Sequence, residues 1–179
     1  MQYHGSPGID AALAAGFPVK INTVLLDWLT PLDVSRLIRF ALDKGVEVRF
    51  IEQMSFDDTE KPYLPQDQVI GWLEKRHRVT PLPHDGKSPH VKLFDCDGAK
   101  IGFISPRSHP FCDGCNKLRL IPSGQLRACL ASTAHVDIRT VLRRPHTDND
   151  VIRAIQQAVS LKPETGPWTA NSEMWRVGG

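Results

Sequence analysis

The sequence lacks the features of a membrane, secreted or nucleic-acid-coating protein. No stretch approaches the roughly 20 consecutive apolar residues that a membrane-spanning helix needs. The N-terminus has neither the basic start nor the apolar core of a secretory signal. The formal net charge of the 179 residues is only +2, so any anion must be held by local charge. We therefore expect a cytoplasmic protein that binds neither membrane nor nucleic acid.

Cysteine is scarce, with four residues in the chain. In a thiol-reducing compartment, clustered cysteines are more often metal ligands or catalytic groups than disulfide partners. Three of the four lie close together: Cys112 and Cys115 form C-x2-C, and Cys129 follows after thirteen residues. A hairpin between them would bring the three thiols together, which predicts a metal centre.

The first 80 residues alternate between strand and helix patterns. Strands are predicted over 19–26 and 46–54, and helices over 10–16, 31–44 and 66–76. Thr30 before Pro31 is a helix N-cap signal, and Gly45 ends the same helix. This order predicts parallel strands joined by crossover helices.

The pattern changes after about residue 80, within a segment that contains Pro81 and Pro83. Hairpins are predicted over 90–104, turning at Asp97-Gly98, and over 116–130, turning at Ser123-Gly124, with helices over 137–144 and 149–160. We predict two domains, residues 1–80 and 81–179.

The spacing of the thiols leaves the metal open. A structural zinc site needs a fourth ligand, for which Cys96 and His109 are the candidates. An iron–sulfur cluster held by three cysteines would instead keep one iron open to an outside ligand. Cysteines that bind no metal are the third alternative.

The charge around the thiols is locally positive. Between residues 105 and 130, four basic residues stand against the single acid Asp113; the four are Arg107, Lys117, Arg119 and Arg127. The alternation in NKLRL predicts Lys117 and Arg119 on one face of a strand. Two such cations suit a phosphate-bearing ligand, and a solvated strand face is the alternative.

Several blocks of the sequence resemble the GTP 3′,8-cyclase family, radical S-adenosylmethionine enzymes that open molybdenum-cofactor biosynthesis. FCDGCNKLRLIPSGQLRACL resembles the family's F-C-x2-C-N-R-x-R-L-x-x-D-G-x-L-x-x-C-L, with the same thirteen-residue gap. VKIN (19–22), VRFIEQMSFD (48–57) and the terminal Gly178-Gly179 also match. Lys117 departs from the family's usual arginine, and DWLTP (27–31) departs from its usual loop.

The resemblance implies an α/β fold: the last strands and helices of an incomplete (β/α) barrel, followed by an α+β iron–sulfur domain with hairpins. It implies that Cys112, Cys115 and Cys129 hold a [4Fe–4S] cluster whose open iron meets the guanine of GTP. It implies GTP contacts for Lys20, Arg49, Lys117, Leu118 and Arg119. It further implies that Met54 lines the S-adenosylmethionine site and that Gly178 and Gly179 project into the active site.

The sequence lacks the C-x3-C-x2-C triplet with which the family binds its radical-generating cluster. We therefore expect this chain alone to be inactive as a GTP 3′,8-cyclase. The N-terminal radical half would be supplied by the same longer protein or by a separate chain, and the family tends to form homodimers. The alternatives are a non-catalytic nucleotide-binding module and a structural zinc domain.

Overall fold

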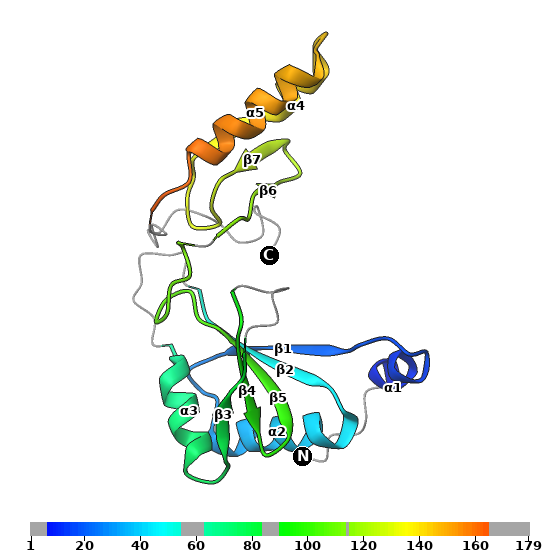
Figure 1. Ribbon diagram of the computed structural model, residues 1–179, viewed down its shortest axis with the longest axis vertical. Helices are drawn as coiled ribbons and strands as arrows, with labels where there is room; N and C mark the ends of the chain where they lie inside the picture. The colour runs from blue at the N-terminus through cyan, green and yellow to red at the C-terminus, as the bar shows by residue number, and fades with distance from the viewer. Residues whose placement is uncertain (1–6, 55–62, 84–89, 114, 165–179) are drawn as a thin grey trace. The chain divides into compact units, whose positions relative to one another are not determined.

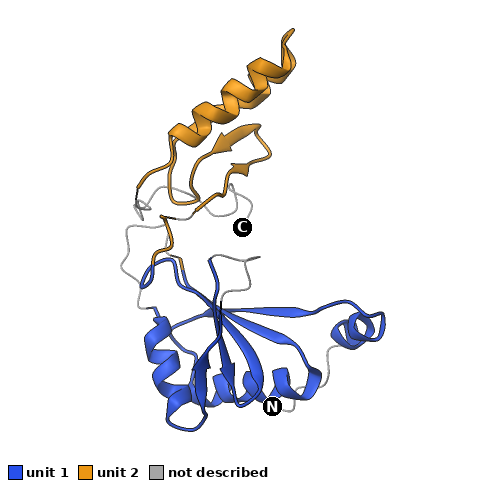
Figure 2. Ribbon diagram, viewed as in Figure 1, with its two compact units in different colours: residues 1–53, 62–109 blue, residues 54–61, 110–179 orange. Residues whose placement is uncertain are grey.

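The computed structural model describes residues 7–54, 63–83, 90–113 and 115–164, and the chain divides into two compact units (Figure 2). Unit 1 comprises Met1–Gln53 and Pro62–His109, and unit 2 comprises Met54–Lys61 and Pro110–Gly179. Both units combine helices and strands, which confirms the predicted α/β class. Within the described residues, no helix is long and apolar enough to cross a membrane.

Unit 1 is built on a five-stranded mixed sheet with the strand order β1-β2-β5-β4-β3 (Figure 1). Its elements are α1 (Pro7–Ala14), β1 (Lys20–Leu25), α2 (Pro31–Lys44), β2 (Glu47–Glu52), α3 (Gln66–Glu74), β3 (Val79–Pro81), β4 (Lys92–Cys96) and β5 (Ala99–Ile104). β1 and β2 run parallel, as predicted, and β2 also runs parallel to β5. β5, β4 and β3 continue the sheet as antiparallel neighbours.

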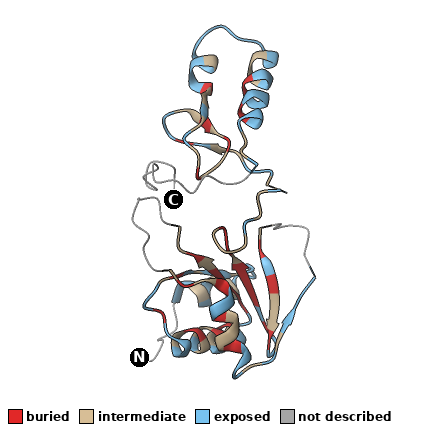
Figure 3. Cartoon of the chain, turned by 90° about the vertical axis from the view of Figure 1, so that its left-hand side faces the viewer, coloured by how far each residue is buried: buried red, intermediate tan, exposed pale blue. Residues whose placement is uncertain are grey.

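The hydrophobic core of unit 1 lies between the sheet and the helices α2 and α3 (Figures 1 and 3). Val48 and Phe50 of β2 and Ile101 and Phe103 of β5 alternate along their strands and are almost fully buried. Burying each large apolar side chain contributes about 1.5–3 kcal/mol, so this face of the sheet is the main source of stability. The opposite face carries the alternate residues of the same strands.

The helix α2 confirms the predicted end signals. The side chain of Thr30 accepts a hydrogen bond from the backbone N–H of Asp33, and the Asp33 carboxylate accepts one from the backbone N–H of Thr30, which completes a capping box. Gly45 ends the helix in the left-handed conformation at φ +65°. The helix therefore begins and ends where its local sequence requires.

The two units divide the chain at a different place from the predicted boundary near residue 80. The hairpin β4–β5 turns at Asp97-Gly98 as predicted, but β5 adds to β2 and so belongs to unit 1. Phe50 and Phe103 are opposite each other in this pairing, with stacked rings whose centroids lie 5.3 Å apart. The prolines near residue 80 mark a change of strand direction within one sheet.

Unit 2 contains a three-stranded antiparallel sheet and two helices. Its elements are β6 (Arg119–Leu120), β7 (Gln125–Arg127), β8 (His135–Asp137), α4 (Ile138–Arg143) and α5 (Asp148–Ser160). Leu126, Ile138, Ala154 and Ala158 form its buried core. The predicted hairpin turning at Gly124 and both predicted helices are confirmed.

One detail of the predicted hairpin is wrong. β6 begins at Arg119, so Lys117 lies outside the strand and the two cations do not share a strand face. The ladder between β6 and β7 is short, with Arg119 opposite Arg127 and Leu120 opposite Leu126. It does not continue to Ala128, whose carbonyl accepts a hydrogen bond from Lys162 at 3.1 Å instead.

Gly124 in this turn is expected to tolerate no side chain. Its φ is +82°, where a Cβ is strained, and an added Cβ would collide with the Cβ of Arg139 on α4. We expect Gly124→Ala to lower the free energy of unfolding by about 1–3 kcal/mol, measured by chemical denaturation. Gly71→Ala is the control, because a Cβ at Gly71 meets nothing within 4 Å. Equal stability of the two variants would contradict this account of the turn.

Candidate functional site

The face of the unit 1 sheet opposite α2 and α3 carries two of the predicted site residues. In the register of β1 and β2, Lys20 is opposite Glu47 and Asn22 is opposite Arg49. These residues alternate with the buried Val48 and Phe50, so their side chains lie on the face away from the core. The parallel strands thus bring Lys20 and Arg49, predicted from separate sequence blocks, onto one polar face.

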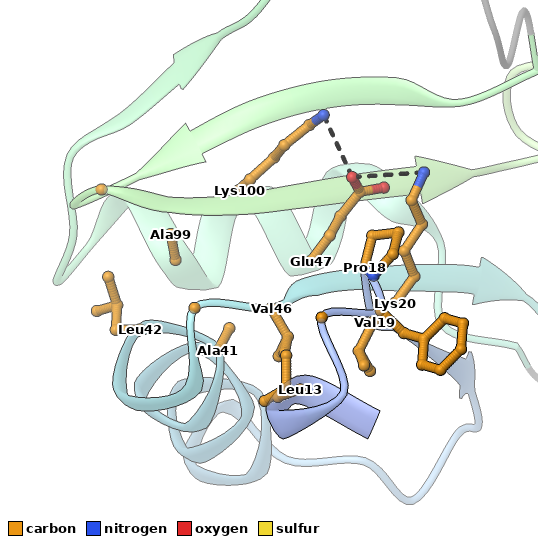
Figure 4. Close-up of a pocket in the computed structure, with 14 residues that line it drawn as sticks. Leu13, Pro18, Val19, Lys20, Ala41, Leu42, Val46, Glu47, Ala99 and Lys100 are labelled. Carbon is orange, nitrogen blue, oxygen red and sulfur yellow. Dashed lines mark ion pairs between the residues drawn. The ribbon is translucent and has the colours of Figure 1, made fainter. Parts of the chain in front are cut away.

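Glu47 organises the cations of this face (Figure 4). Its side chain is 8% exposed, and its oxygens lie 2.6 Å from Arg49 Nε, 3.2 Å from Lys100 Nζ and 3.8 Å from Lys20 Nζ. Burial raises the pKa of Glu47, but hydrogen bonds from Arg49 and Lys100 outweigh it and hold the pKa below its usual value. One carboxylate faces three cations, so these four side chains together keep a net positive charge that attracts an anion.

Arg49 has donor capacity that its neighbours do not use. Its side chain is 12% exposed, and Nε donates to Glu47. Its Nη2 is buried and has no hydrogen-bond partner among the described residues. An unsatisfied buried guanidinium nitrogen is costly, and an acceptor on a bound ligand would remove that cost.

A cavity of about 590 Å³ adjoins the same cations (Figure 4). Lys20, Glu47 and Lys100 contribute its polar wall, and Leu13, Phe17 and other apolar residues contribute the rest. Lys20 therefore borders a space large enough for a small molecule. Arg49 is not among the residues that line it.

Glu52, which ends β2, holds the segment that leads to the cysteines. Its buried carboxylate accepts hydrogen bonds from the backbone N–H groups of Gln66 (3.0 Å), Arg107 (3.1 Å) and Ser108 (3.0 Å), and from the Ser108 hydroxyl. Gln66 is the first residue of α3, where an anion is favoured by the helix dipole. Glu52 thus ties β2, α3 and the segment after β5 together.

Further contacts fix the same segment. The guanidinium of Arg107 lies 3.8 Å from the centre of the Tyr63 ring, and Ser105 donates to the side chain of Gln66 at 2.7 Å. His109 Nε2 lies 2.8 Å from Asp67 Oδ1. Glu52 belongs to the block VRFIEQMSFD, but the sequence alone assigned it no role. A charged residue at the end of a predicted strand is the sequence feature that could have indicated its buried hydrogen bonds.

The three predicted ligands all lie in unit 2, are partly buried and form no disulfide. The backbone N–H of Cys115 donates to the carbonyl of Cys112 at 3.0 Å, so the C-x2-C segment forms a turn. In the part of the chain that the structure describes, no three His, Cys, Asp or Glu side chains are grouped to hold a metal ion. The cluster on Cys112, Cys115 and Cys129 therefore stays a prediction.

Lys162, just after α5, contacts the region of the predicted ligands. Its Nζ lies 3.5 Å from Cys115 Sγ and 3.1 Å from the carbonyl of Ala128, the residue before Cys129. The contact connects the C-x2-C turn to the segment of the third cysteine.

The two candidates for a fourth ligand are engaged elsewhere. Cys96 is fully buried in the core of unit 1, where burial, together with Asp97 and Asp95, raises the pKa of its thiol to about 11. His109 faces Asp67 within unit 1. Among the described residues, neither candidate joins the three cysteines.

The remaining predicted residues have different surroundings. Lys117 is exposed, and Leu118 packs against the core of unit 2, so its side chain has a packing role. Arg119 is partly buried in β6. Met54 is partly buried just after β2, and nothing in its surroundings tests its predicted role. Gly178 and Gly179 lie outside the described residues.

The residues of unit 2 fit an iron–sulfur cluster chemically. Three thiols provide three ligands, Lys162 offsets their charge at Cys115, and Arg127 has buried Nε and Nη1 atoms without a partner among the described residues. A cluster gives each thiolate a different iron, so its ligands stand further apart than those of one zinc ion. The lack of a compact single-ion group among the described residues therefore does not conflict with a cluster.

Together, the fold and the site define a mixed α/β protein with two cationic regions, one of them in the unit that carries the three predicted cysteine ligands. Residues 46–168, which include all three predicted ligands, match the Molybdenum Cofactor Synthesis C family. The chain belongs to this family.

Relatives with assigned names cover nearly the whole chain. The GTP 3′,8-cyclase of Brucella canis is 37% identical over 164 residues, which are 88% of this chain and 47% of that protein. The GTP 3′,8-cyclase of Marinobacter nauticus is 36% identical over 176 residues, 93% of this chain and 53% of that protein. GTP 3′,8-cyclase 1 of Pseudomonas aeruginosa is 35% identical over 175 residues, with the same coverage. The chain spans about half the length of the curated relatives it matches.

Proposed function

We propose that this chain is the part of a GTP 3′,8-cyclase that binds a [4Fe–4S] cluster and GTP in molybdenum-cofactor biosynthesis. The observation that carries the proposal is the family match over residues 46–168, because it contains Cys112, Cys115 and Cys129 in one segment. The contact of Lys162 with Cys115 Sγ supports it, since it places a cation against a predicted ligand.

In this proposal the residues of the chain bind and orient the substrate. When bound, a cluster held by three thiolates offers an open iron to an outside ligand. In unit 2, Arg119 holds phosphate oxygens of GTP. In unit 1, the buried Nη2 of Arg49 is available as a donor to a bound ligand. Lys20 and Lys100 keep the surroundings of Glu47 positive. Fixed cations of this kind contribute by positioning the substrate rather than by chemistry of their own.

The radical chemistry requires a component that this sequence does not encode. Its four cysteines contain no C-x3-C-x2-C triplet, so the cluster that splits S-adenosylmethionine is supplied by a companion segment or chain. Met54 would line the S-adenosylmethionine site formed with that companion. Gly178 and Gly179 would reach the substrate in the assembled enzyme.

A titration with GTP tests the proposal. The chain is reconstituted anaerobically with iron and sulfide, and its cluster spectrum is recorded with and without GTP and ATP. We expect a spectral change with GTP, because guanine reaches the open iron. A spectrum that GTP leaves unchanged, or a colourless protein that contains one zinc and no iron, would contradict the proposal.

Arg119→Ala tests the proposed phosphate contact. A charge-assisted hydrogen bond contributes about 2 kcal/mol, so we expect GTP to bind roughly 30-fold more weakly, measured by isothermal titration. The melting temperature should change little by comparison, because the proposed role is toward the ligand. A loss of stability as large as the loss of affinity would show a packing role instead.

A second candidate function is a nucleotide-binding module without catalysis. The cations around Glu47 and the free Nη2 of Arg49 favour it independently of any cluster. Mixing the chain with a companion that carries the first cluster distinguishes the two. Cyclised product supports an enzyme part, and binding without turnover supports the module.

A further inference from the structure

Arg127 lies at the centre of a row of basic residues in the unit 2 sheet. In the register of the three strands, Arg127 of β7 is opposite Arg119 of β6 on one side and His135 of β8 on the other. Residues that are opposite one another in a sheet project from the same face. We refer to Arg119, Arg127 and His135 as the cationic row.

The cationic row lies on the face of the sheet away from the helices. Leu126 and Val136, the next residue pair along β7 and β8, pack with α4 and α5 in the core of unit 2. Because successive side chains alternate between faces, Arg127 and His135 project from the other face. Neither α4 nor α5 covers that face.

The guanidinium of Arg127 is arranged for an acceptor that the described residues do not supply. Its Nε and Nη1 are both buried, and neither has a hydrogen-bond partner among those residues. Leaving a buried charged donor unsatisfied costs stability, and such a group in a folded protein calls for a reason. Nε and Nη1 donate from different edges of the guanidinium, so satisfying both takes two acceptor atoms, which a polyphosphate with its many oxygens supplies.

The strand pairing adds a second cost. Directly opposite residues have Cβ atoms about 5 Å apart, and like charges at that distance repel each other. The nearby carboxylate of Asp137 accepts two hydrogen bonds from Thr140, at 3.1 and 3.0 Å, in capping α4. An anion on the cationic row would both satisfy Arg127 and screen it from Arg119.

We propose that the cationic row binds the polyphosphate of a nucleotide and that Arg127 is a phosphate ligand in addition to Arg119. The inference rests on the proposed function for the identity of the nucleotide, whereas the binding of polyphosphate follows from the row itself. Arg127 is two residues before Cys129 in the sequence, so a nucleotide on this row lies beside the segment of the predicted ligands.

The experiment measures binding and stability on the same variants. The whole chain, as purified and after anaerobic reconstitution, is titrated with inorganic triphosphate, GTP, ATP and guanosine. Arg127→Met removes the hydrogen-bond donors and keeps much of the apolar part of the side chain. Arg127→Lys keeps the positive charge without the planar guanidinium. Arg144→Met is the control at an exposed position. Each variant is also unfolded with a chemical denaturant.

We expect Arg127→Met to bind triphosphate and GTP at least tenfold more weakly, with Arg127→Lys intermediate and Arg144→Met unchanged. The midpoint of unfolding of Arg127→Met should be equal to or higher than that of the unsubstituted chain, because an unsatisfied buried donor has been removed. A structural arginine would show the reverse, a lower midpoint. Guanosine, which has no phosphate, should bind equally to all variants.

The outcomes separate the inference from the proposed function. If the unsubstituted chain binds no triphosphate, or Arg127→Met binds it equally well or fails to fold, the inference is overturned. If triphosphate binding depends on Arg127 but GTP has no advantage over ATP and triphosphate, the inference stands and the proposed function fails. If the cationic row instead binds an acidic segment of a protein, the unsubstituted chain should bind no triphosphate.

Discussion

Replacing Cys112, Cys115 or Cys129 by serine is expected to bring the iron content of the reconstituted chain from about four atoms per molecule to near zero. A cluster held by three thiolates has no spare ligand, and a serine hydroxyl stays protonated where a cysteine thiol ionises. Iron and sulfide analysis, with the visible absorption spectrum of the anaerobic protein, measures the loss. Each variant should lose the cluster separately.

Cys96→Ala is the matched control for these variants. Cys96 is buried in the core of unit 1 with its pKa raised to about 11, so it is a small apolar residue and not a ligand. We expect it to retain the full iron content and to lose about 1 kcal/mol of stability from the lost sulfur contacts. Loss of iron in Cys96→Ala, or its retention in any of the three serine variants, would overturn the assignment of ligands.

Glu52→Gln is expected to lower the free energy of unfolding by about 3 kcal/mol, within the range for breaking a buried charged network. The carboxylate accepts from three backbone N–H groups and one hydroxyl, and both its oxygens are used. An amide replaces one of these oxygens by an NH2 group, which then faces donors. Chemical denaturation measures the change.

The control for Glu52→Gln is Glu74→Gln, because Glu74 is an exposed carboxylate at the end of α3. We expect this control to change the free energy of unfolding by less than about 0.5 kcal/mol. Because Glu52 holds Arg107 and Ser108, the substitution should also increase hydrogen exchange at those two amides. Equal stability of the two variants, or unchanged exchange at residues 107 and 108, would show that the hydrogen bonds to Glu52 contribute little.

Local sequence signals predicted most of the secondary structure. Thr30 and Gly45 bound α2, and the turns at Asp97-Gly98 and Gly124 have the positive φ angles that glycine permits. These features depend on residues a few positions apart, so they can be interpreted without the fold. The extent of β6 is the exception: the strand begins at Arg119 and is shorter than the alternation in NKLRL predicts.

The sequence also identified the chemical groups of the candidate site. Cys112, Cys115 and Cys129 are recognisable by their spacing, and Lys20 and Arg49 by the blocks around them. Their roles toward a cluster and GTP stay predictions. The structure adds Glu47, which pairs with both Lys20 and Arg49 from the start of β2.

Taken alone, the sequence determined the class of fold, the local elements and the thiols and cations available for binding, because periodicity, capping and spacing act over short separations. Only the tertiary structure decided that β5 extends the sheet beside β2, that Glu52 holds residues 55 and 56 positions away, and that Arg127 is placed between Arg119 and His135. Those pairings depend on which distant segments bury their apolar faces together, and no local pattern specifies that choice.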